Sequence, residues 1–323
     1  MSLTLLSLAE VKQSISMLEA IDALEKAFIQ LAHQSVNMPL RTGIPIAEEE
    51  ALMLTMPAYL AQHKALGLKV VSVFPHNLTH NKPAINGIVM LLDASTGEPK
   101  VVMDGAYLTA LRTGAVSGLA TRYFAPADAK HLAIIGSGAQ AYMQLEAVSA
   151  VRPITHVSIW SRTIENAKSL AQKINKNYEV QVYSTIQEAV KHADVICTVT
   201  SSTEPLIDLA MLKPNVHINA IGSHSPTMQE ISAAVLKEAI VFVDQVEAAL
   251  KEAGEIINAL KHQTLAKTAL FEIGPWLTHK TPNYQHTLTV FKSVGLAIQD
   301  LSVAEVVYQN ALKQQLGLPF LLN

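Results

Sequence analysis

Three cationic residues in the first third of the chain stand in apolar or small-residue surroundings. They are Arg41 in MPLRTGIP, Lys69 in LGLKVVSVFP and Arg112 in LTALRTGAVSG. Lys69 lies within an apolar run, with no acidic residue close to it along the chain. Two guanidinium groups and an ammonium group suit a carboxylate bound in a poorly solvated cleft, because charge-assisted hydrogen bonds are strong there. Three structural ion pairs are the alternative interpretation.

A second chemical pattern is the glycine-containing stretch KHLAIIGSGAQA, residues 130–141. Gly136 permits a tight turn, Gly138 lets backbone N–H groups approach a pyrophosphate, and the small Ala141 allows close packing of helix and strand. The pattern stands between a predicted strand and a predicted helix, whose positive end would face the phosphates. This context predicts a dinucleotide site, with an ordinary glycine-rich loop as the alternative.

The residues after the next predicted strand, 156–160, bear on which dinucleotide binds. NAD-specific sites usually place an acidic residue there, to bond the ribose hydroxyls. Here Ser161, Arg162 and Thr163 follow the strand. An arginine with two hydroxyl groups can bind a 2′-phosphate, so the sequence favours NADP(H), with NAD(H) as the alternative. Otherwise, Arg162 is a surface residue that begins the next helix.

Regular alternation of strand and helix surrounds this turn. Repeated units of this size predict an α/β fold, a Rossmann-type doubly wound parallel sheet with both faces covered. We expect strands at 131–136, 156–160, 179–183, 194–199, 216–221 and 240–244. We expect helices at 139–151, 164–176, 186–192, 208–212 and 230–238.

The remaining chain has a different pattern. A capping box at Ser16 begins an amphipathic helix, and strand-like runs at 51–56, 66–74, 85–93 and 99–104 predict an α+β domain on an antiparallel or mixed sheet. Residues 107–124 have helical spacing despite Gly114 and Gly118, beside which either a neighbouring helix or a cofactor must pack closely. A loop-rich region around Gly274-Pro275 precedes a long helix from Val294 to about Gln315.

Composition narrows the class of protein. A chain of 323 residues is long for one core, so we expect two domains. With 16% charged residues and a net charge of −3, it has no basic footprint for nucleic acid or an anionic membrane. No apolar run is long enough to span a bilayer, which favours a cytoplasmic location. Cys197, the single cysteine, is expected to be a buried thiol, and the 12 histidines lack metal-ligand spacing, so no metal is expected.

Together these motifs resemble the ornithine cyclodeaminase and mu-crystallin family over essentially the whole chain. Those that carry the resemblance are MPLRTGIP, GLKVVSVFPHN, INGIVMLLDASTGEP, ALRTGAVSGLATRYFA, IIGSGAQA, IWSRT, VTSSTEPLI, NAIGSHSPTMQEI and TVFKSVGLAIQD. The resemblance implies a substrate-binding and dimerisation domain at 1–118 with 296–323, a dinucleotide-binding domain at 119–295, and a homodimer.

The resemblance also assigns residues. Arg41, Lys69 and Arg112 would bind the substrate carboxylate, with Lys69 near the reacting carbon and nitrogen. Residues expected at the cofactor are Thr113, Gly136, Ser137, Gly138, Ala139 and Gln140 at the phosphates; Ser161, Arg162 and Thr163 after the second strand; Thr198, Val199, Thr200 and Ser201 at the adenosine and ribose; and Ile221, Gly222 and Ser293, with Ala220 and Lys292, near the nicotinamide.

Three departures from the cyclodeaminase pattern bear on the reaction. His224 stands where cyclodeaminases carry an aspartate, and Leu54 aligns with their glutamate for the distal amino group of ornithine. Ser161 and Arg162 replace the acid after the second strand. Without these carboxylates nothing evident would hold a diamino acid, which favours another activity of the family, reduction of cyclic ketimines.

The expected reaction is NAD(P)H-dependent reduction of Δ1-pyrroline-2-carboxylate to L-proline, and of the six-membered homologue Δ1-piperideine-2-carboxylate to L-pipecolate. The proton for the imine nitrogen would come through a water held by Lys69 or from His224; a loop histidine without a catalytic role is the alternative. Alternative activities are ornithine cyclodeamination, amino-acid dehydrogenation of pyruvate with ammonia, and NADPH-dependent binding of a small molecule, as in mu-crystallin.

Overall fold

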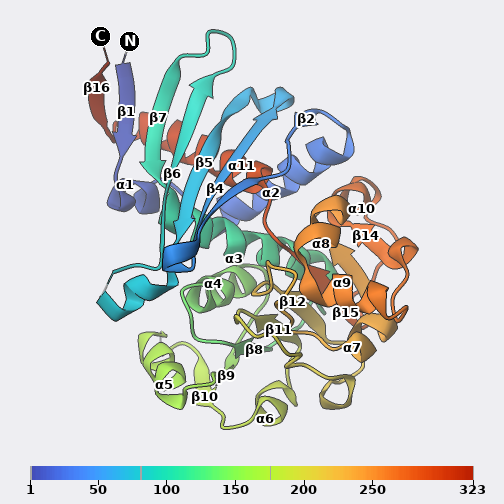
Figure 1. Cartoon of the computed structure of the whole chain (residues 1–323). Helices are drawn as coiled ribbons and strands as arrows, with labels where there is room; N and C mark the ends of the chain where they lie inside the picture. Colours follow the sequence, from blue (N-terminus) through green and yellow to red (C-terminus); the bar gives the residue numbers. More distant parts are fainter. Residues whose placement is uncertain (1, 81, 175, 323) are drawn as a thin grey trace. The chain divides into compact units, whose positions relative to one another are not determined.

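The computed structural model describes residues 2–80, 82–174 and 176–322 and divides the chain into two compact units. Unit 1 comprises Met1–Arg112 and Leu296–Asn323, and unit 2 comprises Thr113–Gly295. The first boundary lies inside the helix α3 (Gly105–Phe124), as does the boundary expected at 118/119 (Figure 1). The second boundary lies at 295/296 in both cases.

Unit 1 is built on a mixed sheet with the strand order β16-β1-β7-β6-β5-β4-β2, and β3 pairs with β4. The pairing of β1 with β7 is parallel and the other pairings are antiparallel, which confirms the expected mixed sheet. Its strands are β1 (Ser2–Leu6), β2 (Val36–Asn37), β3 (Thr42–Ile46), β4 (Ala51–Leu60), β5 (Ala65–Val73), β6 (Ile85–Asp93), β7 (Pro99–Asp104) and β16 (Leu318–Leu321).

Helices cover one face of this sheet. They are α1 (Leu8–Gln13), α2 (Met17–Ala32) and α11 (Ala297–Lys313). Short 3-10 turns lie in the connections between strands: η1 (Ala47–Glu49), η2 (Ala61–His63) and η3 (Pro75–His80). The expected capping box is present: the Glu19 N–H donates to Ser16 Oγ over 3.3 Å, and Ser16 N–H donates to the Glu19 carboxylate over 2.8 Å. α11 packs on α2 and across β4, β5 and β6 (Figure 1). This places the first turn of α11 over the centre of the sheet.

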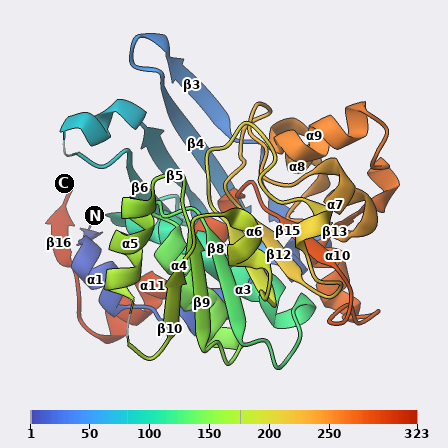
Figure 2. The same cartoon turned by 90° about the horizontal axis from the view of Figure 1, so that it is seen from below.

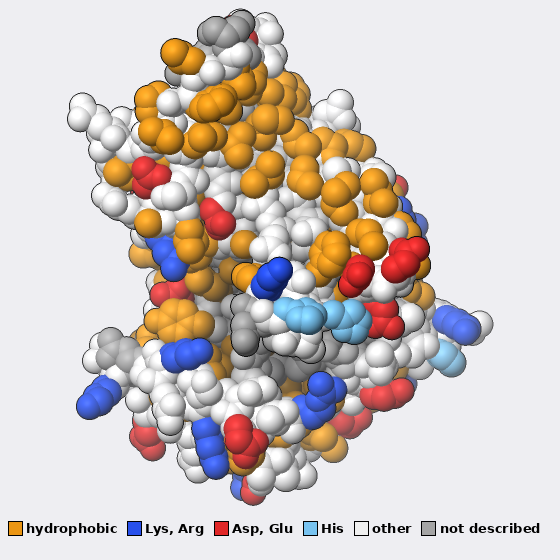
Figure 3. Space-filling view, turned by 60° about the vertical axis from the view of Figure 1, so that its left-hand side comes forward, with side chains coloured by type: hydrophobic (Ala, Val, Ile, Leu, Met, Phe, Trp, Pro, Cys, Tyr) orange, Lys and Arg blue, Asp and Glu red, His pale blue; other side chains and the backbone are white. Residues whose placement is uncertain are grey.

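On the opposite face of the sheet, no helix of unit 1 packs among the residues that the structure describes. Apolar side chains form a patch on this face, which we call the outer sheet face: Pro57, Tyr59, Leu66, Leu68, Val70, Ile88, Met90 and Leu92. In the register of β5 and β6, Leu66 pairs with Leu92, Leu68 with Met90 and Val70 with Ile88. Ile88 is 49% exposed, and Figure 3 shows hydrophobic side chains gathered in this part of unit 1. Contiguous apolar surface of this kind marks an interaction site.

Unit 2 is organised on a parallel sheet with the order β10-β9-β8-β11-β12-β15-β13-β14, in which β10, β9 and β8 lie side by side (Figure 2). Its strands are β8 (His131–Ile135), β9 (His156–Trp160), β10 (Glu179–Val182), β11 (Val195–Thr198), β12 (His217–Ala220), β13 (Ile240–Val243), β14 (Leu270–Glu272) and β15 (Thr289–Lys292). The chain moves outward from β8 to β10 and returns to β11 on the other side of β8. Such a reversal creates the crevice in which doubly wound folds bind dinucleotides, and the expected fold class is confirmed.

Helices and 3-10 turns connect these strands. They are α4 (Ala141–Val151), α5 (Ile164–Lys173), α6 (Ile186–Val190), α7 (Ala233–Glu238), α8 (Val246–Glu252), α9 (Gly254–Lys261), α10 (Ile273–His279), η4 (Leu209–Met211) and η5 (Lys267–Ala269). Gly114 packs against α4, because a Cβ there would lie 2.6 Å from the Met143 carbonyl oxygen. A neighbouring helix therefore accounts for this glycine. Burial raises the pKa of Cys197 to about 12, which confirms a buried neutral thiol.

Several expectations about elements were wrong. The region after β13 is not loop-rich: it holds α8, α9, β14 and α10. Pro275 occupies the first turn of α10, where its missing N–H needs no intrahelical acceptor. The helix expected at 208–212 is the 3-10 turn η4, and the one expected at 230–238 begins only at Ala233. Within the described ranges no helix has both the length and the apolar character needed to cross a membrane.

Candidate active site

The glycine turn leads from β8 into α4 and contacts the ends of both neighbouring strands. Gly136 has φ +115°, a conformation that favours glycine, and a Cβ there would lie 2.8 Å from the Val199 carbonyl oxygen. Its N–H donates to the Trp160 carbonyl over 2.8 Å. Val199 N–H in turn donates to the Ile135 carbonyl over 2.9 Å. The turn is therefore held against the carboxyl ends of β9 and β11.

The structure fits a pyrophosphate at this turn. A Cβ on Gly138 would meet nothing within 4 Å, so the backbone there is open to close approach. Gln140 is the N-cap of α4 but makes no side-chain capping bond, and its buried Oε1 has no hydrogen-bond partner among the described residues. Ala141 N–H, the first of α4, donates to the Gly138 carbonyl over 3.0 Å, so the N–H groups that follow it in the first helical turn are the ones that could bind an anion, beside Ser137 and Ala139 in the turn. Ala141 is fully buried, as close packing requires.

The residues expected near a 2′-phosphate follow β9. Ser137 Oγ donates to Ser161 Oγ over 2.8 Å, which joins this segment to the glycine turn. Arg162 and Thr163 are exposed. Thr163 is the N-cap of α5 without a side-chain capping bond, so helix capping does not occupy its hydroxyl.

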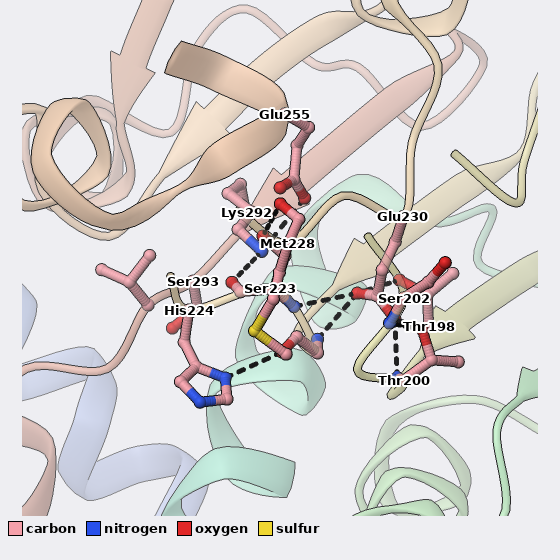
Figure 4. A network of polar contacts seen from close by, with 12 residues as sticks. Thr198, Thr200, Ser202, Ser223, His224, Met228, Glu230, Glu255, Lys292 and Ser293 are labelled. Carbon is pink, nitrogen blue, oxygen red and sulfur yellow. Dashed lines mark hydrogen bonds and ion pairs between the residues drawn. The ribbon is translucent and has the colours of Figure 1, made fainter. Parts of the chain in front are cut away.

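Segments after β11 and β12 meet at the carboxyl edge of the sheet. Thr198 is fully buried and its hydroxyl donates to Glu230 over 2.8 Å, and Thr200 contacts the same carboxylate (Figure 4). The N–H groups of Ile221 and Gly222 donate to the Thr198 carbonyl over 3.0 and 3.1 Å. The predicted cofactor residues of these two segments therefore form one connected edge.

Of the other predicted cofactor residues, Ser293 and Lys292 have their side chains in structural bonds. Ser293 Oγ donates to Asp244 Oδ2 over 2.8 Å. Lys292 is fully buried; its ammonium donates to the Ser223 carbonyl and lies 3.1 Å from Glu255 Oε1. Ser201 is exposed. Thr113 is 8% exposed, and its carbonyl accepts a bond from Gln144.

His224 lies on the exposed loop after β12. Its Nδ1 lies 2.8 Å from the Gly222 carbonyl oxygen, as Figure 4 shows. Because a carbonyl can only accept, this contact fixes a proton on Nδ1. The loop thus fixes the orientation of the His224 ring.

In unit 1 two of the predicted substrate residues, Lys69 and Arg112, bond one carboxylate. Lys69 projects from the helix-covered face of β5, between its cross-strand neighbours Met56 and Val89, and is 1% exposed. Its Nζ donates to Asp300 Oδ1 over 2.6 Å, and Arg112 Nε donates to the same oxygen over 3.0 Å. Lys69 and Arg112 therefore do form structural ion pairs, as the alternative interpretation of the three cations expected.

The cluster retains polar groups for a ligand. Arg112 Nη1 donates to Gln299 Oε1 over 2.9 Å, while Gln299 Nε2 and Asp300 Oδ2 are buried without a hydrogen-bond partner among the described residues. Buried polar atoms are normally paired, and unpaired ones call for an explanation such as a bound molecule.

Burial lowers the pKa of the Lys69 ammonium to about 7, and repulsion from Arg112 and Arg41 acts in the same direction, whereas Asp300 raises it. Arg41, which is partly buried, is thus close enough to influence Lys69. Asp300 bonds Lys69 and Arg112, and the charge of Arg41 also acts on Lys69, so cations outnumber the carboxylate and the cluster suits an anionic ligand.

Sequence reasoning missed Gln299, Asp300 and Glu230. The two polar residues Gln299-Asp300 interrupt the apolar run VGLAIQDLSVA, which is a signal in itself, although Asp300 lies 231 positions from Lys69. Glu230 carries no comparable local signal. Among the described residues no cluster of three or more potential ligands could hold a metal ion.

The sequence matches a known family and several of its characterised members. The sequence profile of the ornithine cyclodeaminase/mu-crystallin family matches residues 1–315. The Δ1-pyrroline-2-carboxylate reductase of Bacillus cereus is 39% identical over 318 residues, covering 97% of this chain and 98% of that protein. The ketimine reductase mu-crystallin of Rattus norvegicus is 38% identical over 276 residues, 85% of each chain.

Solved structures of related proteins match the fold of this chain. The Δ1-pyrroline-2-carboxylate reductase of Thermococcus litoralis, in complex with NADH and L-proline, matches with a TM-score of 0.94 at 33% identity and covers 98% of this chain and 99% of that one. An archaeal alanine dehydrogenase dimer with bound NAD matches with a TM-score of 0.92 at 33% identity, over 100% of both chains. The chain therefore belongs to the ornithine cyclodeaminase/mu-crystallin family.

Proposed function

We propose that the protein is an NAD(P)H-dependent oxidoreductase that reduces a cyclic imino acid, Δ1-pyrroline-2-carboxylate, to L-proline. Δ1-Piperideine-2-carboxylate, reduced to L-pipecolate, is the second substrate we expect. The observation that carries the proposal is the buried cluster of Lys69, Arg112, Gln299 and Asp300. The relatives named as pyrroline-2-carboxylate and ketimine reductases support it. We place the reaction in the cytoplasm, as composition led us to expect.

The cluster can bind and orient the substrate carboxylate. Arg41 and Arg112 supply guanidinium donors, and the unpaired Gln299 Nε2 supplies a neutral donor. Asp300 holds Lys69 and Arg112 at fixed positions, so their donors need not reorganise when the anion arrives. Fixing the carboxylate next to the C=N bond favours a reactive orientation of the imine.

Reduction also needs a proton and a hydride. NAD(P)H, which the glycine turn at Gly136 and Gly138 would hold, would supply the hydride. Lys69, with a pKa of about 7, can be protonated at neutral pH and still release its proton, directly or through a water, to the imine nitrogen. The C=N double bond becomes a single bond, and the product is a secondary amine with its carboxylate retained. His224 is the alternative proton source.

Ornithine cyclodeamination is the weaker candidate. Leu54 is buried on the same sheet face as Lys69, and pairs with Val71, so an apolar side chain takes the place of the acid that would hold a distal amino group. His224 takes the place of the other acid. We infer that the site takes a substrate with one carboxylate and an apolar ring.

For the cofactor we propose a preference for NADPH, with NADH as the alternative. The exposed Arg162 and the hydroxyls of Ser161 and Thr163 suit a 2′-phosphate. The related Thermococcus litoralis enzyme was solved with NADH, so the preference must be tested directly.

We further propose that the protein is a homodimer joined through the outer sheet face. Its eight apolar residues form a surface that can be buried against the same surface of a second copy related by a two-fold axis. The related alanine dehydrogenase is a dimer, which supports this assembly.

The central experiment assays NADPH oxidation with both cyclic imines, ornithine, and pyruvate plus ammonium. We expect oxidation with the cyclic imines alone, with proline or pipecolate as product. Proline formation no faster than in an enzyme-free control would contradict the proposal. Ammonia release from ornithine with NAD would indicate a cyclodeaminase. Activity that requires added ammonium would indicate an amino-acid dehydrogenase, and NADPH binding without turnover would indicate a binding protein.

The pH dependence tests Lys69 as the acid. We expect kcat/KM for the imine to fall as pH rises through about 7, because protonated Lys69 is lost. Asp300→Asn removes the carboxylate that raises the Lys69 pKa, so the fall should occur at lower pH. Lys69→Arg stays charged, so this fall should vanish while turnover drops. The imine titrates equally in all three proteins, so an unchanged profile in both variants would contradict the assignment.

Cofactor preference is tested at Arg162. We expect Arg162→Ala to weaken NADPH binding by about tenfold or more, through loss of a charge-assisted bond, and to leave NADH binding nearly unchanged. Lys168→Ala, which removes an exposed cation of the following helix α5, is the matched control. Fluorescence titration of both cofactors measures the effect. Wild-type protein that binds NADH at least about tenfold more tightly than NADPH would rule out the preference.

The dimer is tested by placing a charge on the outer sheet face. Ile88→Lys should give a folded monomer by light scattering, because two-fold symmetry introduces the buried charge twice. Phe271→Lys changes a similarly exposed side chain in unit 2 (43% exposed) and should leave the dimer intact. A folded I88K variant that remains dimeric would show that the contact lies elsewhere.

A further inference from the structure

Glu230 is a fully buried carboxylate at the carboxyl edge of the unit 2 sheet. It accepts five hydrogen bonds: from Thr198 Oγ1 (2.8 Å), Thr200 N–H (2.6 Å), Thr200 Oγ1 (2.8 Å), Gly222 N–H (2.8 Å) and Ser223 N–H (3.2 Å). Two of these groups follow β12, and the rest belong to the end of β11 and the segment after it. A single side chain thus joins both segments (Figure 4).

The contact requires a close approach of the two segments. A Cβ on Gly222 would lie 2.2 Å from the Thr200 carbonyl oxygen and 2.5 Å from Glu230 Oε1, so only glycine fits. The backbone of Glu230 is itself fixed, because its carbonyl accepts from Leu206 N–H over 2.8 Å and Ile207 N–H over 3.0 Å. Glu230 is therefore held by hydrogen bonds at its backbone carbonyl and at both oxygens of its carboxylate.

The three backbone N–H donors favour the ionised form of Glu230. Burial raises its pKa and repulsion from Glu255 acts in the same direction, while Lys292 and the Thr200 bonds oppose this. The N–H groups of Thr200, Gly222 and Ser223 cannot accept a hydrogen bond, so a protonated carboxyl would lose acceptor capacity that they need. Five converging donors in a dry site therefore favour the carboxylate.

Ser223 is held by two further contacts of the same network. Its carbonyl accepts from the buried Lys292 ammonium, which pairs with Glu255, and its hydroxyl donates to the Met228 carbonyl over 2.8 Å. Since its N–H donates to Glu230, every polar group of Ser223 is engaged. The base of the loop that carries His224 is therefore rigid.

The network reaches the glycine turn. A Cβ on Gly136 would lie 3.1 Å from Thr200 Cγ2 and 2.8 Å from the Val199 carbonyl oxygen. The segment that Glu230 holds therefore packs against the glycine turn. We infer that Glu230 is a positioning residue for the dinucleotide: it fixes the segments after β11 and β12 at the separation that the cofactor requires. This rests on the proposed function, in that unit 2 binds NAD(P)H.

The test replaces Glu230 by glutamine, which has nearly the same shape. The amide nitrogen of the E230Q variant would point donors at donors, so the segments should separate and NADPH should bind about tenfold or more weakly. Thr198→Val tests the same contact more gently, because Thr198 is fully buried and the change removes one hydroxyl donor to Glu230. Thr198→Ser, which keeps the hydroxyl, should retain more affinity than T198V.

Asp194→Asn is the matched control. Asp194 also accepts two backbone N–H groups of this sheet, from Lys130 over 2.8 Å and His131 over 2.9 Å, but at the opposite, amino edge. We expect D194N to lower the unfolding temperature and leave NADPH affinity unchanged. Direct titration of NADPH and NADH, well below the unfolding temperature of each variant, measures the difference.

The outcomes separate the inference from the proposed reaction. Weakened binding in E230Q and T198V with normal binding in D194N supports the positioning role. Wild-type affinity in folded E230Q or T198V, or equal weakening in D194N, overturns it. Because binding is measured without an imine, a protein that follows this pattern and reduces no imine contradicts the reaction alone.

Discussion

The pairing of the Lys69 ammonium with Asp300 is the interaction on which the organisation of unit 1 depends. A cation on a central strand, between Met56 and Val89, would be too costly to bury alone. Asp300 comes from the first turn of α11, so the C-terminal helix must lie across β5 for the strand to accept the lysine. The fold and the proposed carboxylate site thus have a common origin.

Unit 2 uses a buried carboxylate in a similar way, with backbone groups in place of a cation as the main partners. Glu230 accepts from segments that follow different strands, and Asp244 accepts from Ser293 Oγ and the N–H groups of Val294 and Gly295. Irregular chain at a strand end leaves N–H groups without ladder partners, and these must be satisfied when buried. Side-chain carboxylates meet that need and at the same time fix the shape of the loops.

The sequence predicts those features that neighbouring residues determine, and not those that depend on residues far apart in the chain. The turn at Gly136, the capping box at Ser16 and the strands at 85–93 and 99–104 follow from neighbouring residues, and the structure has them as expected. The partner of Lys69 could not be identified, since Asp300 is 231 positions away. α10 was missed because Gly274-Pro275 looks like a loop signal, although proline is accepted in a first helical turn. The cofactor and substrate residues came largely from family resemblance, and their roles stay predictions.

The lowered pKa of Lys69 has a thermodynamic consequence that supports a functional origin. The unfolded chain holds this proton up to a pKa near 10.5, the folded chain only to about 7. Between these values the unfolded state binds more protons, so the contribution of Lys69 to stability becomes less favourable as pH falls from 10.5 toward 7. A buried apolar residue at this position would carry no such penalty. Selection for stability alone does not explain a lysine here, whereas a site that must attract a carboxylate and release a proton near neutral pH requires a group of this kind.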